Sequence, residues 1–277
     1  SNHKYLKFRY LNYKDTAIRR IMHLHAPDIY SPVISVAEAQ KSICIIGYNK
    51  ITERLLMNLA LNSHYINHQK LKVYLFADNQ DGFDDFAVKY QLTFTLDIDT
   101  LKANEINEFS GNAAAVYITE EEDSKILFAF SVLRRNRAIQ KIPRIFISDT
   151  DQTAASLIRD ENTCFINLAD EASVFSNLID ESIDKLAQTI HGDYLLNLQQ
   201  INPDIPTHRP WDILPDEIRN RNRQQADHMW IKLRSLGCIA VPLDNAGNAY
   251  ELQHDERLEA LSKAEHNRWC AYLYCNG

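Results

Sequence analysis

The sequence predicts an α/β protein, with a Rossmann-like parallel sheet domain followed by a mainly α-helical domain. Short apolar runs such as 42–47 and 72–77 alternate with helical patterns, which is typical of parallel strands that are buried on both faces. From about residue 173 only helical periodicity remains. The 277 residues are 45% hydrophobic and 24% charged, so the chain has enough apolar side chains for two cores.

The lead segment, residues 1–40, is basic and aromatic at its start. A helix is predicted through residues 19–22, and Pro27 and Pro32 then interrupt regular structure. We expect this helix to pack on the domain that follows.

The Rossmann-like domain is predicted over residues 41–172. Its expected strands are 42–47, 72–77, 92–96, 113–118, 143–148 and 163–168. Helices are predicted at 51–61, after the first strand, and at 121–137, after the fourth. This alternation indicates a parallel sheet with helices on both faces.

The helical domain is predicted over residues 173–277. A long helix is expected from 173 to about 200, and a second from 214 to 237. A turn is expected at 244–248, and the last helix should begin near Asp255.

A pattern of Leu, His and an aromatic residue occurs twice in this domain, at 186–194 and 261–269. His191 and His266 hold the same position in the two copies. Internal repeats indicate duplicated structural units, so we expect the two helices to have equivalent surroundings.

Further pieces accompany this repeat in a fixed order. They are Pro210-Trp211, Asn222-Arg223, Ala226-Asp227 and Ala264-Glu265-His266-Asn267-Arg268-Trp269. Together they make the last third of the chain resemble the ryanodine receptor (RyR) repeat domain, in its bacterial form. Compared with that family, the second copy stops at Gly277 and lacks its remaining half.

The first candidate site is the loop after the first strand. Gly47 is kept from a Gly-x-Gly-x-x-Gly pattern, whereas Asn49 and Thr52 replace the other two glycines. Asp78 follows the next strand, where an acidic residue binds a ribose hydroxyl. The segment resembles the TrkA-N (RCK) domain of potassium-uptake regulators. Because a Cβ at Asn49 narrows the approach to pyrophosphate, we expect weak or no NAD binding, and leave open another nucleotide or no ligand.

The second candidate site lies in the helical domain, where donors, acceptors and indole rings are combined. Its candidate ligand-binding residues are Trp211, Asn222, Arg223, Asp227, Glu265, His266, Arg268 and Trp269. Arginine can bind an anionic group with two parallel donors, and tryptophan offers a stacking face. The alternative is that these residues pair with one another to hold the helices together.

Composition limits the function classes. The net charge of −7 argues against binding to a nucleic-acid polymer. Five cysteines without a CxxC pattern indicate reduced thiols and a cytoplasmic location. No P-loop, nucleophile elbow or HExxH motif is present. The chain begins Ser-Asn without Met, so a membrane channel segment upstream in a longer protein remains open.

These observations lead to a functional expectation. We expect a non-catalytic sensor or regulator of a small nucleotide-derived ligand, and the resemblances imply control of a channel or of cation transport, with a homo-oligomer as one option. The alternatives are an NAD-binding oxidoreductase-like enzyme, for which no catalytic acid or base can be named, and a structural assembly module.

Overall fold

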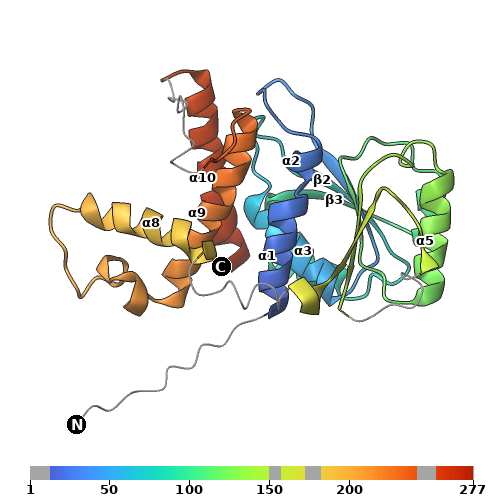
Figure 1. Ribbon diagram of the computed structural model, residues 1–277, viewed down its shortest axis with the longest axis horizontal. Coiled ribbons are helices and arrows are strands. Elements are labelled where there is room, and N and C mark those ends of the chain that lie inside the picture. Colours follow the sequence, from blue (N-terminus) through green and yellow to red (C-terminus); the bar gives the residue numbers. More distant parts are fainter. Residues whose placement is uncertain (1–12, 150–156, 172–181, 242–253, 277) are drawn as a thin grey trace, which may run out of the picture.

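The computed structural model describes residues 13–149, 157–171, 182–241 and 254–276. A sheet with its helices forms one part of the molecule, and three long helices lie beside it (Figure 1). The predicted change from strands to helices is thus confirmed. The expected boundary at 172–173 and the turn at 244–248 lie outside the described residues.

The sheet has six strands in the order β3-β2-β1-β4-β5-β6, and all five pairings are parallel. The strands are β1 (Ser42–Ile46), β2 (Leu71–Phe76), β3 (Leu96–Leu101), β4 (Val116–Ile118), β5 (Arg144–Ser148) and β6 (Thr163–Asn167). This is the Rossmann-like order, which confirms the predicted fold class. The direction of strand addition reverses between β1 and β4, which is where ligands bind in such sheets.

The third strand was predicted wrongly, at 92–96. The structure has a 3₁₀ turn, η1 (Leu92–Phe94), and the strand begins only at Leu96. Because β3 is an edge strand, it carries charged residues, and Lys72 of β2 contacts Asp97 at 3.0 Å and Asp99 at 2.9 Å. A search for continuous apolar runs therefore selects the preceding turn instead.

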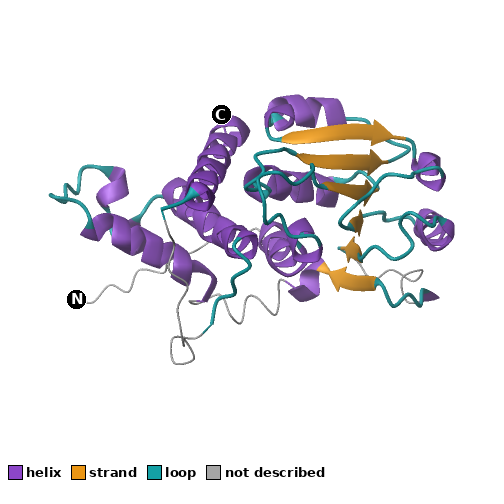
Figure 2. Cartoon of the chain, turned by 90° about the horizontal axis from the view of Figure 1, so that it is seen from above, coloured by secondary structure: helices purple, strands orange, loops and turns teal. Residues whose placement is uncertain are grey.

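Helices cover both faces of the sheet (Figure 2). They are α3 (Lys50–Asn62), α4 (Phe83–Lys89), α5 (Asp123–Arg135) and the short η2 (Ala103–Asn107). Successive residues of β1 face opposite cores: Ile43 and Ile45 belong to the cluster that contains α3, and Cys44 and Ile46 to the cluster that contains α5.

The lead segment forms α1 (Tyr13–His25) and α2 (Pro27–Tyr30). Helix α1 packs on α3 and buries Ala17, Ile18 and Ile21, so the expectation that the lead packs on the sheet domain is confirmed. Pro27 interrupts the helix as predicted and occupies the first turn of α2, where no amide donor is needed.

The C-terminal helices are α8 (Ser182–Leu196), α9 (Asp216–Ser235) and α10 (Glu256–Asn276), with the turns η3 (Pro206–His208) and η4 (Trp211–Ile213) between α8 and α9. Helix α8 ends at Leu196, four residues before the expected end. Helix α9 packs against both α8 and α10, and α10 also packs against α3. Ile231 and Leu261 therefore belong to the same buried cluster as the α3 face of the sheet.

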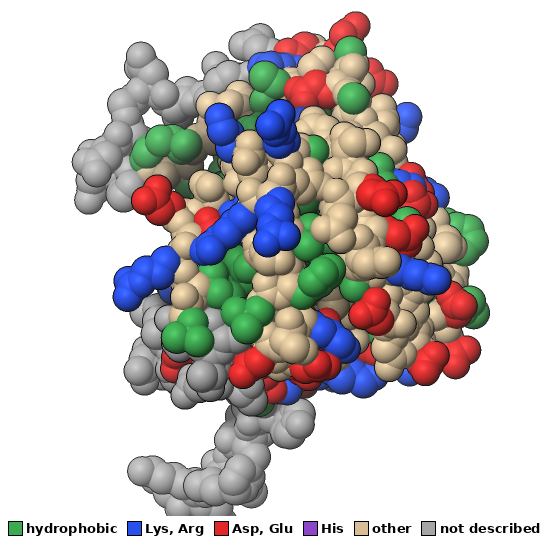
Figure 3. All heavy atoms as spheres, turned by 90° about the vertical axis from the view of Figure 1, so that its right-hand side faces the viewer, with side chains coloured by type: hydrophobic (Ala, Val, Ile, Leu, Met, Phe, Trp, Pro, Cys, Tyr) green, Lys and Arg blue, Asp and Glu red, His purple; other side chains and the backbone are tan. Residues whose placement is uncertain are grey.

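Among the described residues, no helix is both long and apolar enough to cross a membrane. The outer face on the α5 side carries basic, acidic and hydrophobic side chains (Figure 3). Helix α5 exposes Leu127 and Phe128 there.

Candidate functional site

The loop between β1 and α3 lies at the reversal point of the sheet and comes very close to the end of β4. Gly47 has φ +96°, and a Cβ there would lie 2.9 Å from the Glu120 amide nitrogen. A side chain at residue 47 is therefore excluded both by backbone conformation and by space. Gly47 thus allows the loop after β1 to contact the loop after β4, and this role does not require a bound phosphate.

The Asn49 side chain occupies the first turn of α3. Its Oδ1 accepts hydrogen bonds from the amides of Ile51 at 2.9 Å and Thr52 at 3.1 Å. The Thr52 hydroxyl accepts in return from the Asn49 amide at 3.1 Å, which completes a capping box. Amides of this turn are the donors that hold pyrophosphate in dinucleotide-binding proteins. Here two of them, the amides of Ile51 and Thr52, already donate to the Asn49 side chain.

The same side chain bridges the two loops. Asn49 Nδ2 donates to the Thr119 carbonyl at 2.5 Å, and the buried Thr52 hydroxyl lies 2.8 Å from the Thr119 hydroxyl. Asp78, at the end of β2, is exposed and accepts from the Ala103 amide at 3.3 Å. Gly47, Asn49 and Thr52 therefore lie together, in contact with the residues that follow β4.

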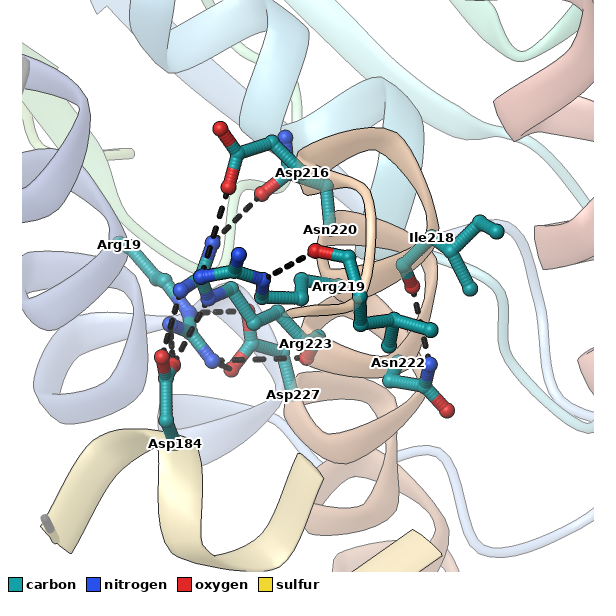
Figure 4. A network of polar contacts seen from close by, with 10 residues as sticks. Arg19, Asp184, Asp216, Ile218, Arg219, Asn220, Asn222, Arg223 and Asp227 are labelled. Atoms are coloured by element: carbon teal, nitrogen blue, oxygen red, sulfur yellow. Dashed lines mark hydrogen bonds and ion pairs between the residues drawn. The ribbon is translucent and has the colours of Figure 1, made fainter. Parts of the chain in front are cut away.

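The charges of Arg223 and Asp227 are paired within the protein (Figure 4). Arg223 Nε and Nη2 donate to the two carboxylate oxygens of Asp184, at 2.7 and 2.5 Å. Arg19 of α1 donates to Asp227 at 2.5 and 2.7 Å and lies 3.9 Å from Asp184. This charged junction, defined as Arg19, Asp184, Arg223 and Asp227, joins α1, α8 and α9.

Trp211 and Asn222 lie beside this junction without joining its ion pairs. The Arg223 guanidinium lies 5.9 Å from the centre of the Trp211 ring, which is a cation–π distance. Asn222 Nδ2 donates to the Ile218 carbonyl one turn earlier in α9, at 2.9 Å. Trp211 is therefore a candidate aromatic residue whose ring contacts an arginine guanidinium.

Glu265 and Arg268 belong to a second charged group, between α9 and α10. Glu265 Oε1 accepts from Arg268 Nε at 2.8 Å, and Oε2 lies 2.7 Å from Lys232 and 2.8 Å from His228. Although burial alone would raise it, the His228 hydrogen bond and the charges of Arg268 and Lys232 lower the pKa of Glu265 to about 2.

His228 is completely buried at the centre of this group. Its Nδ1 faces the Glu265 carboxylate, and its Nε2 lies 2.8 Å from the His64 carbonyl oxygen. Both ring nitrogens therefore lie within hydrogen-bond distance of an oxygen, and the ring joins α9 to α10 and to the end of α3.

His266 and Trp269 lie on the solvent-exposed surface of α10. Both are exposed, Trp269 by 47%. In the first copy of the repeat, His191 is 3% exposed, and its Nε2 donates to the Arg209 carbonyl at 2.8 Å. The expectation of equivalent surroundings is therefore wrong for the described residues, because a loop covers the histidine of α8 but not that of α10.

The eight candidate ligand-binding residues of the helical domain thus fall into three groups. Trp211, Asn222, Arg223 and Asp227 lie at or near the charged junction. Glu265 and Arg268 lie in the His228 group, and His266 and Trp269 are exposed on α10. Among the described residues, no cluster of three or more His, Cys, Asp or Glu could hold a metal ion.

A small cavity of about 30 Å³ lies where α1, α2, α3 and α9 meet. The residues of its lining that matter here are Arg19, Asp28, Asn62, Asp227, Trp230 and Arg234. Asp28 is 2% exposed, and one of its carboxylate oxygens accepts from Arg234 Nε. The other, Oδ1, is buried without a hydrogen-bond partner, and so is Asn62 Oδ1.

Of these residues, only Asp227 was among the sequence candidates. The sequence marks Pro27 only as an interruption of regular structure, and Asn62 is one of several polar residues at the end of α3. Their burial depends on α9, which lies more than 150 residues later in the chain. No spacing within the sequence could therefore indicate them.

Comparisons with protein-family models, with curated proteins and with solved structures found no significant match. What the structure establishes is a Rossmann-like parallel α/β domain followed by helices. The RyR and TrkA-N resemblances remain predictions of the sequence.

Proposed function

We propose that this chain is a non-catalytic sensor or regulator that binds a small nucleotide-derived ligand where its sheet domain meets its helices. One observation carries the proposal. The residues that connect the two parts, Arg19 with Asp227 and Asp28 with Arg234, also line a small cavity. Two residues of the same lining, Asp28 and Asn62, each have a buried side-chain oxygen without a hydrogen-bond partner. Buried polar atoms without partners are rare and mark places where a ligand or water binds.

A ligand at this location could change how the sheet domain and the helices are attached to each other. Helix α1 packs on α3 of the sheet domain and is bonded to α9 through Arg19. A ligand that changes how α1 and α9 approach each other would therefore change how the two parts are held together. Such differential contact is what a regulatory ligand needs in order to shift an equilibrium.

The NAD-dependent alternative receives less support. A dinucleotide would need the first-turn amides of α3, and Asn49 already occupies two of them. It would also have to displace the contact between Asn49 and Thr119, which closes the approach from β4. We therefore place the ligand outside the reversal point of the sheet.

A structural assembly module is the second candidate. It is favoured by the internal pairing of Arg223 with Asp184 and of Glu265 with Arg268, residues that a ligand pocket would leave available. In this alternative the helices have a packing role only. A part in channel or cation-transport control follows from the RyR and TrkA-N resemblances and belongs to the sensor proposal.

A ligand screen separates the two candidates. The melting temperature of the purified chain should rise with at least one of ATP, AMP, ADP-ribose or a cyclic dinucleotide, since binding to the folded state stabilises it. Replacing Asp227 by Asn should reduce that rise more than replacing Asp204, an exposed residue outside the junction. If no nucleotide at millimolar concentration shifts the melt, the structural module is the better description.

A further inference from the structure

A thiol, an imidazole and a phenol lie together where the end of α1 meets the start of β6. Cys164 Sγ lies 3.7 Å from His25 Nε2, and the other ring nitrogen of His25, Nδ1, lies 2.7 Å from the Tyr30 hydroxyl. A nucleophile, a base in contact with it and a third group that orients the base form the arrangement that activates cysteine and serine nucleophiles. Cys164 and His25 are 139 residues apart along the chain, so only the fold brings them together.

The imidazole of His25 is held in place through its backbone and its ring. The buried Tyr117 of β4 donates its hydroxyl hydrogen to the His25 carbonyl at 2.6 Å. The rings of His25 and Tyr30 are stacked, with centroids 6.4 Å apart. When Nδ1–H of His25 donates to the Tyr30 oxygen, Nε2 carries no proton and can accept that of the thiol. Tyr30 is therefore a positioning residue, which selects the tautomer of the base.

The surroundings keep the thiol and the imidazole uncharged near neutral pH. Burial lowers the pKa of His25 below its ordinary 6.5, against the opposing charge of Glu171. Burial and the same carboxylate raise the pKa of the Cys164 thiol above its ordinary 9.0. Glu171 is itself paired with Arg20 of α1 at 2.7 Å, and burial raises the pKa of Tyr30. Between the first two pKa values the sulfur keeps its proton, so its reaction needs a base, and His25 is free to serve as one.

This pair of residues supplies what thiol–disulfide exchange requires. Cys164 is exposed, so a small disulfide can reach its sulfur from solvent. Exchange needs an accessible sulfur and the removal of its proton, and His25 provides the second of these. Acyl transfer would require in addition a set of donors placed for an oxyanion, which these three residues do not provide. The contact therefore favours exchange over acyl transfer.

We propose that Cys164 is a modification site for low-molecular-weight disulfides such as glutathione disulfide, with His25 as its base. Cys164 Sγ attacks one sulfur of the disulfide, so that a bond to that sulfur forms while the original S–S bond breaks. The electron pair of the broken bond leaves on the departing sulfur. The thiol proton passes to His25 Nε2 and then to the departing sulfur. The products are a mixed disulfide at Cys164 and one free thiol.

A second cysteine–histidine contact in the chain serves as a matched control. Cys270 Sγ lies 3.5 Å from His266 Nε2, but no residue in the described part of the chain hydrogen-bonds the Nδ1 of His266. The purified chain is incubated with glutathione disulfide near neutral pH, and each cysteine is followed by mass spectrometry. Cys164 should form the mixed disulfide at least about tenfold faster than Cys270. His25→Asn should slow the reaction of Cys164 at least about tenfold, whereas His266→Asn should leave it unchanged.

The pH profile of the rate distinguishes a base from a residue that only supports the structure. In the wild type the rate at Cys164 should change less than about threefold between about pH 7 and pH 8, because both values lie between the pKa of His25 and that of Cys164. In His25→Asn the reaction depends on free thiolate, so its rate should rise about tenfold over the same interval. Tyr30→Phe should lower the rate and keep the flat profile, since it loosens the base without removing it.

The outcomes are independent of the proposed function, because neither Cys164 nor His25 lines the cavity beside the charged junction. Equal rates at Cys164 and Cys270 would overturn the modification site. A wild-type rate that rises about tenfold per pH unit would overturn the role of His25. If His25→Asn does not fold, as judged by circular dichroism, the pH profile of the wild type still decides.

Discussion

At the scale of single residues, buried charges in this protein hold elements together. Arg144 begins β5, and its side chain is 1% exposed. It is paired with Asp160, and it donates to the carbonyl of Leu133, in the last turn of α5, at 3.2 Å and to that of Gln140, in the turn that follows, at 2.7 Å. One guanidinium thus satisfies a carbonyl that the end of a helix leaves unpaired and a second one in the next turn.

Replacing Arg144 by Leu should lower the free energy of unfolding by about 3–5 kcal/mol, because it strands the buried Asp160 carboxylate. Arg221→Leu is the matched control, since its pair with Glu217 is 43% and 66% exposed and should contribute less than about 1 kcal/mol. Urea unfolding followed by circular dichroism measures both. Similar losses in the two variants would contradict the assigned role of Arg144.

Glu265 should make the stability depend on pH. Its pKa is about 2 in the folded protein against an ordinary 4.5, so the stabilisation is present above pH 4.5 and is lost as the pH falls towards 2. The shift corresponds to about 3 kcal/mol at most. The difference in unfolding free energy between wild type and Glu265→Gln should therefore be largest near pH 7 and shrink by pH 3. A difference that stays constant over this range would show that the carboxylate charge is not involved.

The partners of these charges also show why the candidate site could not be read from the sequence. Arg223 and Asp227 were selected from the sequence as candidate ligand-binding residues, and in the structure Asp227 pairs with Arg19, 208 residues away. Only the packing of α1 against α9 brings them together. Sequence spacing shows which residues share one face of a helix. It does not show whether a residue of opposite charge lies on another helix that packs against that face.

At the scale of elements, the start of α3 illustrates how local structure replaces a ligand. The glycine pattern of a dinucleotide loop leaves amides free for phosphate, whereas here the Asn49 carboxamide accepts from two of them. The sequence showed that the glycines were missing, and it predicted weak NAD binding from the added Cβ. It did not show that the substituting side chain would itself occupy the donors.

The wild-type chain should accordingly bind NADH with a Kd above roughly 100 μM. Asn49→Gly should strengthen whatever binding exists, because it frees the first-turn amides and restores the backbone approach. Asn49→Ala should instead lower stability by about 0.5–2 kcal/mol through the lost cap. Isothermal titration and urea unfolding measure these effects, and submicromolar NADH binding by the wild type would show that the cap does not block the site.

Strands could be predicted from the sequence where both of their faces are buried. The inner strands β1 and β2 read as apolar runs because both of their faces are covered, whereas β3 was misplaced because an edge strand carries charges. The repeated pattern of α8 and α10 gave similar ring pairs, with His–Tyr and His–Trp centroids both 6.1 Å apart. Helical spacing fixes such local geometry, whereas the surroundings of each helix depend on distant segments.

At the scale of the whole molecule, the sheet domain and the helices share one core. Ile21 of α1, Leu55 of α3, Ile231 of α9 and Leu261 of α10 belong to a single buried cluster. Shared burial of this kind makes the unfolding of one part expose apolar surface of the other. The charged junction adds polar contacts across the same contact zone.

The two parts should therefore unfold together, and the tryptophans allow this to be measured. All three, Trp211, Trp230 and Trp269, lie in the helical part, so their fluorescence reports on α8–α10, while hydrogen exchange in β1 and β4 reports on the sheet. In wild type both transitions should have the same urea midpoint, as expected of one cooperative unit. Tryptophan exposure well before the loss of strand protection would contradict a shared core.

Breaking the charged junction should reveal how far it supports this cooperativity. Arg19→Met keeps most of the side-chain length but removes the partner of Asp227, at a cost of about 1–3 kcal/mol. Because this substitution weakens the attachment of α1 to α9, the tryptophan transition should move to lower urea more than the strand transition does. Arg221→Met, outside the junction, should move neither. Equal shifts of both transitions in Arg19→Met would mean that the apolar cluster alone couples the two parts, and that a ligand at the junction could not loosen one part without unfolding the other.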